Sequence, residues 1–397
     1  MGKLKALFIG AAAVCCAVLS GTSTAAGVFL RNAAVFSAGV FAVGYNVESN
    51  GRTASTGGTS SEENSSVPES GTSSVPQSSS TFGTESRSVN SGESSAAASV
   101  PELPAEKQGR IIVKNRSDAV DDTDYSEFTQ NSGDIERYNF GYFDDPNIVT
   151  LESGAQLRNL TDESNAALQK LSEELPWDNW DNSAANSDEP LVLIYHTHTC
   201  ESFLPFGRVY DEDYPVRSVD CTRNITAVGD AICEALAKRG ISSVHDCTVH
   251  DDPVFTGAYY RSADSMTEIL EEYPSIKIAI DIHRDGIINA DGSVTAPVAE
   301  INGKTAAQFM IITGCDSEES PLPDYRENFK LACLIQNAAE ERYPTLARPI
   351  MFDYRSYNQS LFEGDLLIEV GSQGNSFEEA EYCGELLGNA IADVFNT

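Results

Sequence analysis

Residues 191–201 read LVLIYHTHTCE, and this stretch decides the fold. Its first five residues are apolar without interruption, which is typical of a strand buried on both faces of a parallel sheet. The runs IKIAID at residues 276–281 and LLI at residues 366–368 have the same character. Each run leads directly into titratable side chains, so the chemically active groups lie at the ends of the predicted buried strands.

Helical patterns alternate with these strands along the chain. Apolar residues recur every three or four positions between residues 224 and 239, on a stretch that Gly240 ends. Ser376 and Glu379 have the spacing of a capping box, which would open a final helix running to about residue 395. Further helices are predicted at residues 164–171, 262–272 and 326–342, and further strands at residues 110–113, 241–244 and 308–313. The alternation predicts an α/β fold with a twisted, mostly parallel sheet flanked by helices on both faces.

The start of the chain is basic and then apolar. Lys3 and Lys5 precede a run from residue 7 to residue 30, which matches the roughly 20 apolar residues that a helix needs to cross a bilayer. Lysines before this run and acidic sequence after it place the N-terminus in the cytoplasm and the remainder outside. Residues 1–47 are therefore predicted to be a membrane anchor or signal region with one transmembrane helix.

Three regions follow this predicted anchor. Residues 48–107 are dominated by Ser, Thr, Gly, Glu and Pro, with almost nothing to bury, so we expect a disordered linker. Residues 108–188 predict an N-terminal arm or small subdomain, and residues 189–397 carry the strands and helices of a catalytic domain. The 60 acidic residues against 26 basic ones give a formal net charge of -34, which argues against a nucleic-acid partner.

Three of the five histidines lie at the ends of predicted strands. His196 and His198 follow the first run, with Glu201 close behind, and His283 follows the second. In open α/β sheets, ligands gather at the carboxyl ends of the strands. Two imidazoles and a carboxylate, with a fourth position left to water, are the usual ligands of hydrolytic zinc. The sequence therefore predicts a Zn2+ site built from His198, Glu201 and His283.

Two further residues are predicted to be catalytic. Glu369 lies in the last apolar strand, where an additional carboxylate can orient or deprotonate a zinc-activated water. Arg284 can stabilise an oxyanion or bind a substrate carboxylate, although an ion pair between Glu369 and Arg284 would explain both residues equally well. His196 and His198 point the same way if their strand persists, so His196 stays an alternative ligand or a neighbour that supports the site.

The cysteines and the common short motifs add little. Cys15 and Cys16 lie in the predicted anchor, and the other seven cysteines lack a CxxC or any other metal spacing. We interpret most of them as small buried apolar residues. No G-x-S-x-G elbow, P-loop or G-x-G-x-x-G occurs, which removes the commonest serine-hydrolase and nucleotide-binding functions.

Several longer segments carry a resemblance to a known family. LVLIYHTHTCESFLP, VHDCTVHDDPVFTGAYYRS, IAIDIHRDG, ITGCD and YNQSLFEGDLLIEVGSQGNSFEEA follow one another across residues 191–396, and GAQLRNLTDESN lies upstream at residues 154–165. In this order they resemble the stage II sporulation protein P family of endospore-forming bacteria. Any one segment would be a weak match, but together they are specific.

The resemblance implies a fold like that of zinc N-acetylmuramoyl-L-alanine amidases, an N-terminal membrane anchor and peptidoglycan as the substrate. Members of the family are described as amidases that also cleave peptide cross-links during septal thinning and forespore engulfment. The implied partners are the stage II sporulation proteins D and M, and the implied location is the cell membrane with an extracytoplasmic catalytic domain. By position, the histidine motif of the family falls on residues 196–201, its second histidine on His283 and its catalytic glutamate on Glu369.

Other ligand sets and other functions stay open. Cys200 stands where the family would have a small hydroxyl residue, and a thiol there could itself ligate zinc. A thiol hydrolase would use Cys200 as nucleophile with a nearby histidine as base, although both crowd one short turn. A non-catalytic scaffold would keep the fold and bind the cell wall without turnover. The sequence does not decide which bond of the wall is cut.

Overall fold

The computed structural model describes residues 107–124, 128, 134–177, 188–205 and 214–395. The predicted anchor at residues 1–47 and nearly all of the predicted linker at residues 48–107 lie outside these ranges. None of the helices within the described ranges has the length and apolar character needed to span a bilayer.

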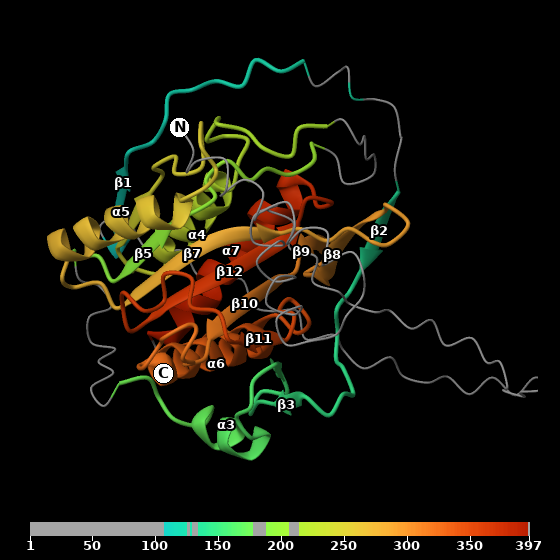
Figure 1. The fold of residues 1–397 in the computed structure, drawn as a ribbon. Coiled ribbons are helices and arrows are strands. Elements are labelled where there is room, and N and C mark those ends of the chain that lie inside the picture. The colour runs from blue at the N-terminus through green and yellow to red at the C-terminus, as the bar shows by residue number, and fades with distance from the viewer. Residues whose placement is uncertain (1–106, 125–127, 129–133, 178–187, 206–213, 396–397) are drawn as a thin grey trace, which may run out of the picture. The chain divides into compact units, whose positions relative to one another are not determined.

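A nine-stranded sheet forms the centre of the fold (Figure 1). Its strands run in the order β1 (Ile111–Lys114), β6 (Ser243–Asp246), β5 (Val192–Tyr195), β7 (Ile278–Asp285), β12 (Asp365–Ser372), β10 (Phe309–Gly314), β11 (Ile350–Asp353), β4 (Gln156–Asn159) and β3 (Ile148–Thr150). Neighbouring strands are parallel except for the pairs β10–β12 and β3–β4, which are antiparallel. The prediction of a mostly parallel sheet is therefore confirmed.

Helices cover both faces of this sheet, as predicted. The described helices are α3 (Asn165–Leu171), α4 (Thr226–Lys238), α5 (Ala258–Glu272), α6 (Tyr325–Arg342) and α7 (Phe377–Val394). Strand β5 shows the two layers, because Val192 and Ile194 belong to the large core that α4, α6 and α7 share. Leu193 and Tyr195, which alternate with them, pack instead against Met266 and Ile269 of α5. Each side chain buried in this way stabilises the fold by roughly 1.5–3 kcal/mol.

The ends of two helices show why the chain folds locally as it does. The Ser376 side chain accepts a hydrogen bond from the Glu379 backbone, and the Glu379 carboxylate accepts one from the Ser376 backbone, so the predicted capping box opens α7. Strand β6 begins two residues later than predicted. The amide of Ile241 donates to the Leu236 carbonyl, 3.0 Å away, and Gly240 has φ 79°, so residue 241 still belongs to the end of α4.

A second, three-stranded sheet was not predicted. It consists of β2 (Ile135–Tyr138), β8 (Val294–Ile301) and β9 (Lys304–Ala307), with β2 parallel to β8 and β8 antiparallel to β9. Elsewhere in the 108–188 region, β1 lies at one edge of the central sheet and β3 at the other (Figure 1). The described parts of that region thus complete both edges of the central sheet.

Candidate functional site

The site is assembled by three adjacent strands of the central sheet. Strand β7 lies between β5 and β12, and all three run in the same direction. His283 of β7 is paired in register with Glu369 of β12, and residues 196–201 follow the end of β5. Parallel neighbours bring their carboxyl ends to one edge, so the three clusters named from the sequence meet there.

His198 and His283 converge at this edge. Their ring centres are 5.2 Å apart and their planes are inclined by 85°. Two imidazoles that share one zinc ion, each nitrogen about 2.1 Å from it, place their ring centres about 5 Å apart. The separation of this pair therefore fits a single ion.

The third predicted ligand lies beside His283. Glu201 Oε2 is 3.8 Å from His283 Nδ1, and the same oxygen accepts a hydrogen bond from the Arg284 amide at 2.9 Å. Within the described ranges, no three His, Cys, Asp or Glu side chains stand in ready ligating geometry. Zinc would thus require small side-chain movements, in a donor set whose chemistry suits it.

His198, His283 and Glu369 each have a buried polar atom without a hydrogen-bond partner: His198 Nδ1, His283 Nε2 and Glu369 Oε2. Buried polar atoms are rarely left without a partner, and functional sites are where such exceptions gather. The two nitrogens face the carboxylates of Asp251 and Asp281, whereas Glu369 Oε2 is available to a ligand. The fit to a bound cation therefore rests on the spacing of the two rings and on the chemistry of the donor set.

The charge of His283 depends on the carboxylates around it. Burial alone would lower its pKa, but Asp281, Glu201 and Glu369 raise the pKa of His283 to about 10. Asp281 Oδ1 lies 2.9 Å from His283 Nε2, close enough for an ion pair although not aligned as a hydrogen bond. Zinc ligands must be deprotonated, so metal binding at His283 would release this proton.

Asp281 also anchors the turn that carries His198. Its two carboxylate oxygens accept hydrogen bonds from the amide and the hydroxyl of Thr197, at 2.8 and 2.6 Å. Asp281 is therefore a hydrogen-bonding strut between the two segments. This carboxylate ties the end of β5 to β7 and holds the two histidines in one place.

Glu369 lies next to His283 with only 7% of its surface exposed. Burial raises the pKa of Glu369, and Asp285 and Glu201 raise it further, while His283 and Arg348 oppose them; the result is about 8. A carboxyl group with a pKa near neutrality can both accept and deliver a proton. This property agrees with the catalytic role expected of Glu369.

Arg284 contacts backbone carbonyls, not the Glu369 carboxylate with which the sequence suggested an ion pair. Its guanidinium donates hydrogen bonds to three backbone carbonyls, those of Ser202 at 2.7 Å, Asp285 at 3.2 Å and Val216 at 3.0 Å. In the described part of the chain it forms no ion pair with Glu369. Arg284 thus fastens the segment around Glu201 to β7, and its catalytic role stays a prediction.

The two histidines of the His-Thr-His motif separate. His196 Nδ1 lies 3.0 Å from the Ile282 carbonyl, and its Nε2 lies 3.0 Å from His245 Nε2. Both nitrogens of His196 are therefore engaged away from His283. This arrangement favours His198 over His196 as the ligand.

The environment of Cys200 does not suit a nucleophile. The residue is 3% exposed, and burial together with the neighbouring Asp251 raises the pKa of its thiol far above the usual range. Thiolates, not thiols, attack carbonyl carbons. The other described cysteines are also buried and unpaired, as predicted for small apolar residues.

Two aromatic residues of the site were not singled out from the sequence. Phe255 stacks on His198, with ring centres 4.4 Å apart and planes within 3°, and Tyr259 approaches the same imidazole edge-on at 5.5 Å. Both residues follow β6, a neighbour of β5 in the sheet. The end of this fourth strand was therefore the sequence feature that could have pointed to them.

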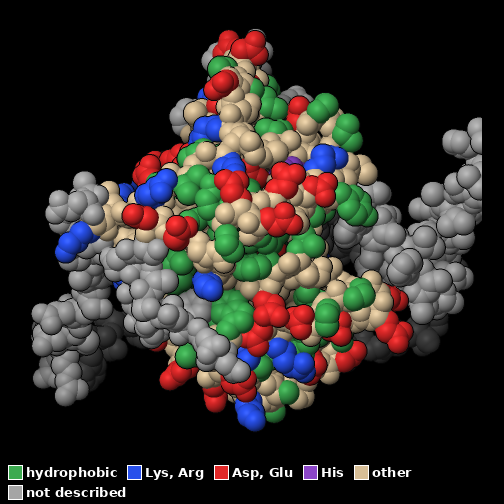
Figure 2. All heavy atoms as spheres, turned by 90° about the vertical axis from the view of Figure 1, so that its left-hand side faces the viewer, with side chains coloured by type: hydrophobic (Ala, Val, Ile, Leu, Met, Phe, Trp, Pro, Cys, Tyr) green, Lys and Arg blue, Asp and Glu red, His purple; other side chains and the backbone are tan. Residues whose placement is uncertain are grey.

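The histidines of the protein are hidden from the surface. Figure 2 shows acidic and hydrophobic side chains mingled over the face it displays, with hardly any histidine visible, because all five histidines are at most 4% exposed.

The fold and the site together define a class: an α/β protein whose parallel strands gather histidines and carboxylates at one edge of the sheet. The chain belongs to the stage II sporulation protein P family, whose model matches residues 78–392.

Proteins similar to this chain include one curated relative and two solved structures. The stage II sporulation protein P of Bacillus subtilis (strain 168) is 30% identical over 220 residues, which cover 53% of this chain and 51% of the relative. The chain thus spans about half the length of that relative. The amidase AmiC2 of Nostoc punctiforme and an N-acetylmuramoyl-L-alanine amidase from Clostridium difficile 630 are 13% and 12% identical, with TM-scores of 0.30 and 0.31. Each match covers 52% of this chain and 95% of the other.

Proposed function

We propose that this chain is a zinc-dependent peptidoglycan hydrolase of sporulation, acting as an N-acetylmuramoyl-L-alanine amidase and also on peptide cross-links. The observation that carries the proposal is the convergence of His198 and His283, 5.2 Å apart, beside Glu369. Membership in the stage II sporulation protein P family supports the cell wall as the target.

The residues divide into those that hold zinc and those that move protons. His198, His283 and Glu201 would hold the ion, which supplies Lewis acidity toward water and toward a carbonyl oxygen. Asp281 keeps the His283 ring in place through its 2.9 Å contact with Nε2, which leaves Nδ1 on the side of Glu201. These contacts fix the orientation of His283 before any substrate arrives.

Glu369 would take a proton from the attacking water and pass it to the leaving nitrogen. Its Oε2 is buried and has no hydrogen-bond partner, so this oxygen is available to a water or a substrate. Burial and the neighbouring Asp285 raise the pKa of Glu369 above its usual value, toward the range in which a carboxyl group can both accept and deliver a proton. Phe255 and Tyr259 pack around His198 and exclude water from that side of the site.

The decisive experiment measures zinc content and product release together. The purified chain is expected to bind about one zinc ion and to release stem peptides from isolated cell wall. His283→Ala is expected to lose both properties, whereas Glu369→Gln should keep zinc and lose turnover, because only the proton carrier is removed. Mass spectrometry of the products separates amidase from endopeptidase cleavage.

His250→Ala is a matched control, because it removes another buried imidazole whose Nε2 faces Asp246, 3.9 Å away. Full activity of Glu369→Gln, or activity that survives exhaustive chelation, would contradict the proposal. Wall binding without any turnover in the zinc-loaded protein would favour the non-catalytic scaffold instead.

The proposal extends to location and partners. The basic and then apolar start of the sequence supports a membrane anchor within residues 1–47, with the catalytic domain outside the cell membrane. Membership in the family supports stage II sporulation proteins D and M as partners. Fractionation of sporulating cells, with alkaline extraction of the membranes, tests the anchor.

A further inference from the structure

Each of the two converging imidazoles has a carboxylate at its edge. Asp281 of β7 serves His283, whereas the carboxylate beside His198 comes from a loop. Asp251 Oδ2 lies 3.7 Å from His198 Nδ1, and that nitrogen is buried without a hydrogen-bond partner. Asp251 is therefore placed to interact with the buried ring nitrogen of His198.

Asp251 is itself fixed from two other directions. Its Oδ1 accepts a hydrogen bond from the Cys200 amide at 3.1 Å, and its Oδ2 accepts one from Arg217 at 2.8 Å. The carboxylate is fully buried. The group is thus a rigid acceptor whose charge is paired with that of Arg217.

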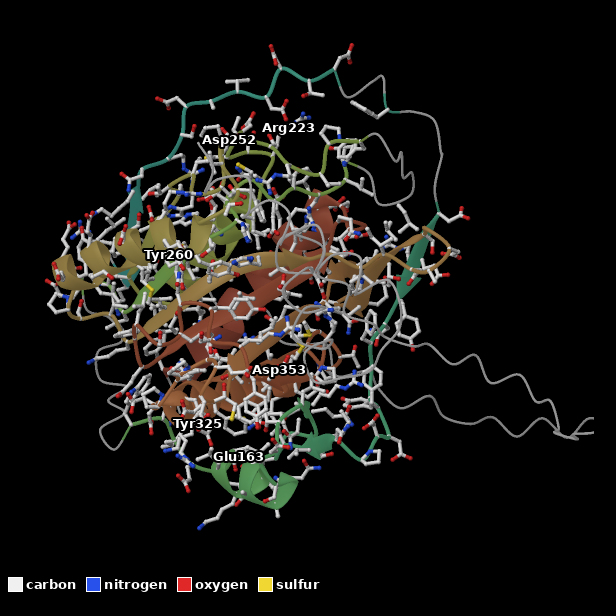
Figure 3. All side chains as sticks on the ribbon, viewed as in Figure 1. Glu163, Arg223, Asp252, Tyr260, Tyr325 and Asp353 are labelled. Carbon is white, nitrogen blue, oxygen red and sulfur yellow. The ribbon has the colours of Figure 1, made fainter. Side chains whose placement is uncertain are left out.

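The loop that carries Asp251 is held in one conformation. Residues 247–257 join β6 to α5, and Asp251 lies in the part of this connection from residue 250 to residue 257, the 250–257 loop. Asp252 within the loop and Tyr260 just beyond it are labelled in Figure 3. Arg261 of α5 donates hydrogen bonds to the carbonyls of His250, Val254 and Thr256. A single guanidinium therefore fastens both ends of the 250–257 loop to the helix.

The same loop also holds the face of the His198 ring. Phe255 stacks on it with ring centres 4.4 Å apart, and the guanidinium of Arg217 lies 5.2 Å from the centre of the Phe255 ring. Asp251 thus stands at the edge of the imidazole while Phe255 covers its face. Both contacts come from one short segment, which restricts how the ring can turn.

We propose that Asp251 is the positioning residue of His198: it accepts a hydrogen bond from the Nδ1–H group and so reserves the Nε2 lone pair for zinc. The inference rests on the proposed zinc site. A carboxylate at the far nitrogen of a metal-bound histidine fixes both the tautomer and the orientation of the ring. Arg217 balances the charge of Asp251, so the carboxylate stays ionised inside the fold.

The test compares two isosteric substitutions in the full chain. Asp251→Asn keeps the volume of the side chain but removes the anionic acceptor, so zinc should bind about 10- to 100-fold more weakly. Asp246→Asn is the matched control, because Asp246 is equally buried and its carboxylate contacts Thr248, Asn115 and His250 instead. Its zinc affinity should stay close to that of the wild type.

Affinity is measured by competition with a chromophoric chelator, and geometry by the visible absorption of the Co2+-loaded protein. Asp251→Asn should change the Co2+ spectrum, whereas a merely structural role would lower the thermal stability of the metal-free protein and leave the spectrum unaltered. Wild-type affinity and an unaltered spectrum in Asp251→Asn would overturn this inference alone. A wild-type chain that binds no zinc would overturn the proposed function as well.

Discussion

The imidazoles of His196 and His245 face each other in the core, with their Nε2 atoms 3.0 Å apart. The Ile282 carbonyl can only accept a hydrogen bond, so His196 donates from Nδ1 and must accept at Nε2. Burial and the neighbouring His245 lower the pKa of His196 to about 3, which keeps this ring neutral. His245 in turn contacts Asp230, 3.0 Å from its Nδ1, so a polar chain runs from β7 to α4.

Gly229 of α4 makes room for this pair, and its substitution by alanine is expected to destabilise the fold. A Cβ at position 229 would lie 2.4 Å from His245 Nε2 and 2.8 Å from His196 Nε2. Overpacking costs about 1–3 kcal/mol, more than the gain of up to about 1 kcal/mol from alanine in a helix. Urea unfolding measures the loss. In a His245→Ala background the same substitution should cost less, and equal losses in both backgrounds would contradict the steric explanation.

Asp365 is expected to weaken the fold as the pH rises. The residue is 1% exposed and accepts a hydrogen bond from the Tyr195 hydroxyl, 3.1 Å from each carboxylate oxygen. Burial, reinforced by Asp281, raises the pKa of Asp365 well above its usual value. In the unfolded chain the Asp365 carboxyl ionises near pH 4. Its contribution to stability is therefore fully present below about pH 4 and is lost as the pH rises through the higher pKa of Asp365 in the folded protein.

Asp365→Asn should therefore stabilise the protein at pH 7 to 8 and have little effect near pH 4. Unfolding free energies measured across this range check the sign. A substitution that destabilises equally at every pH would mean that the hydrogen bond with Tyr195, rather than ionisation, is decisive.

Arg348 and Asp285 form a buried ion pair whose two halves depend on each other. Arg348 Nη1 lies 2.9 Å from Asp285 Oδ2, and the Arg348 side chain has no exposed surface. The Nε and Nη2 atoms of Arg348 have no hydrogen-bond partner. Arg348→Met leaves the Asp285 carboxylate uncompensated, so we expect a loss of about 3–5 kcal/mol. The double variant Asp285→Asn, Arg348→Met should lose much less than the sum of the single losses. Additive losses in chemical denaturation would show that the pair is not coupled.

The buried strands and helices could be predicted because each carries its own local pattern. The five apolar residues before His196 and the Ser376–Glu379 capping box are visible without any knowledge of their neighbours. The small sheet could not be predicted in this way. Strand β2 pairs in parallel with β8, which lies more than a hundred residues further along the chain, and β8 contains Pro297, which lowers its strand propensity.

The convergence of the strand ends that carry His198, His283 and Glu369 could be predicted, but the contacts of these residues could not. His196 and His198 would share a face only if β5 persisted, but the strand ends at Tyr195 and the chain turns, so the two rings diverge. The acceptors of Arg284 are backbone carbonyls of an irregular segment, such as that of Ser202, and backbone acceptors leave no mark on the sequence.

Replacement of Cys200 by alanine is expected to leave hydrolysis and zinc binding intact. The buried thiol has a raised pKa, so it is protonated at neutral pH and cannot attack a carbonyl. The expected cost is a loss of stability of about 1 kcal/mol from the removed apolar volume. Cys233→Ala is a matched control, since Cys233 is also buried and lies in α4. Activity that disappears in Cys200→Ala but persists in Cys233→Ala and in the presence of a chelator would contradict the zinc site. It would show that hydrolysis uses the Cys200 thiol as its nucleophile.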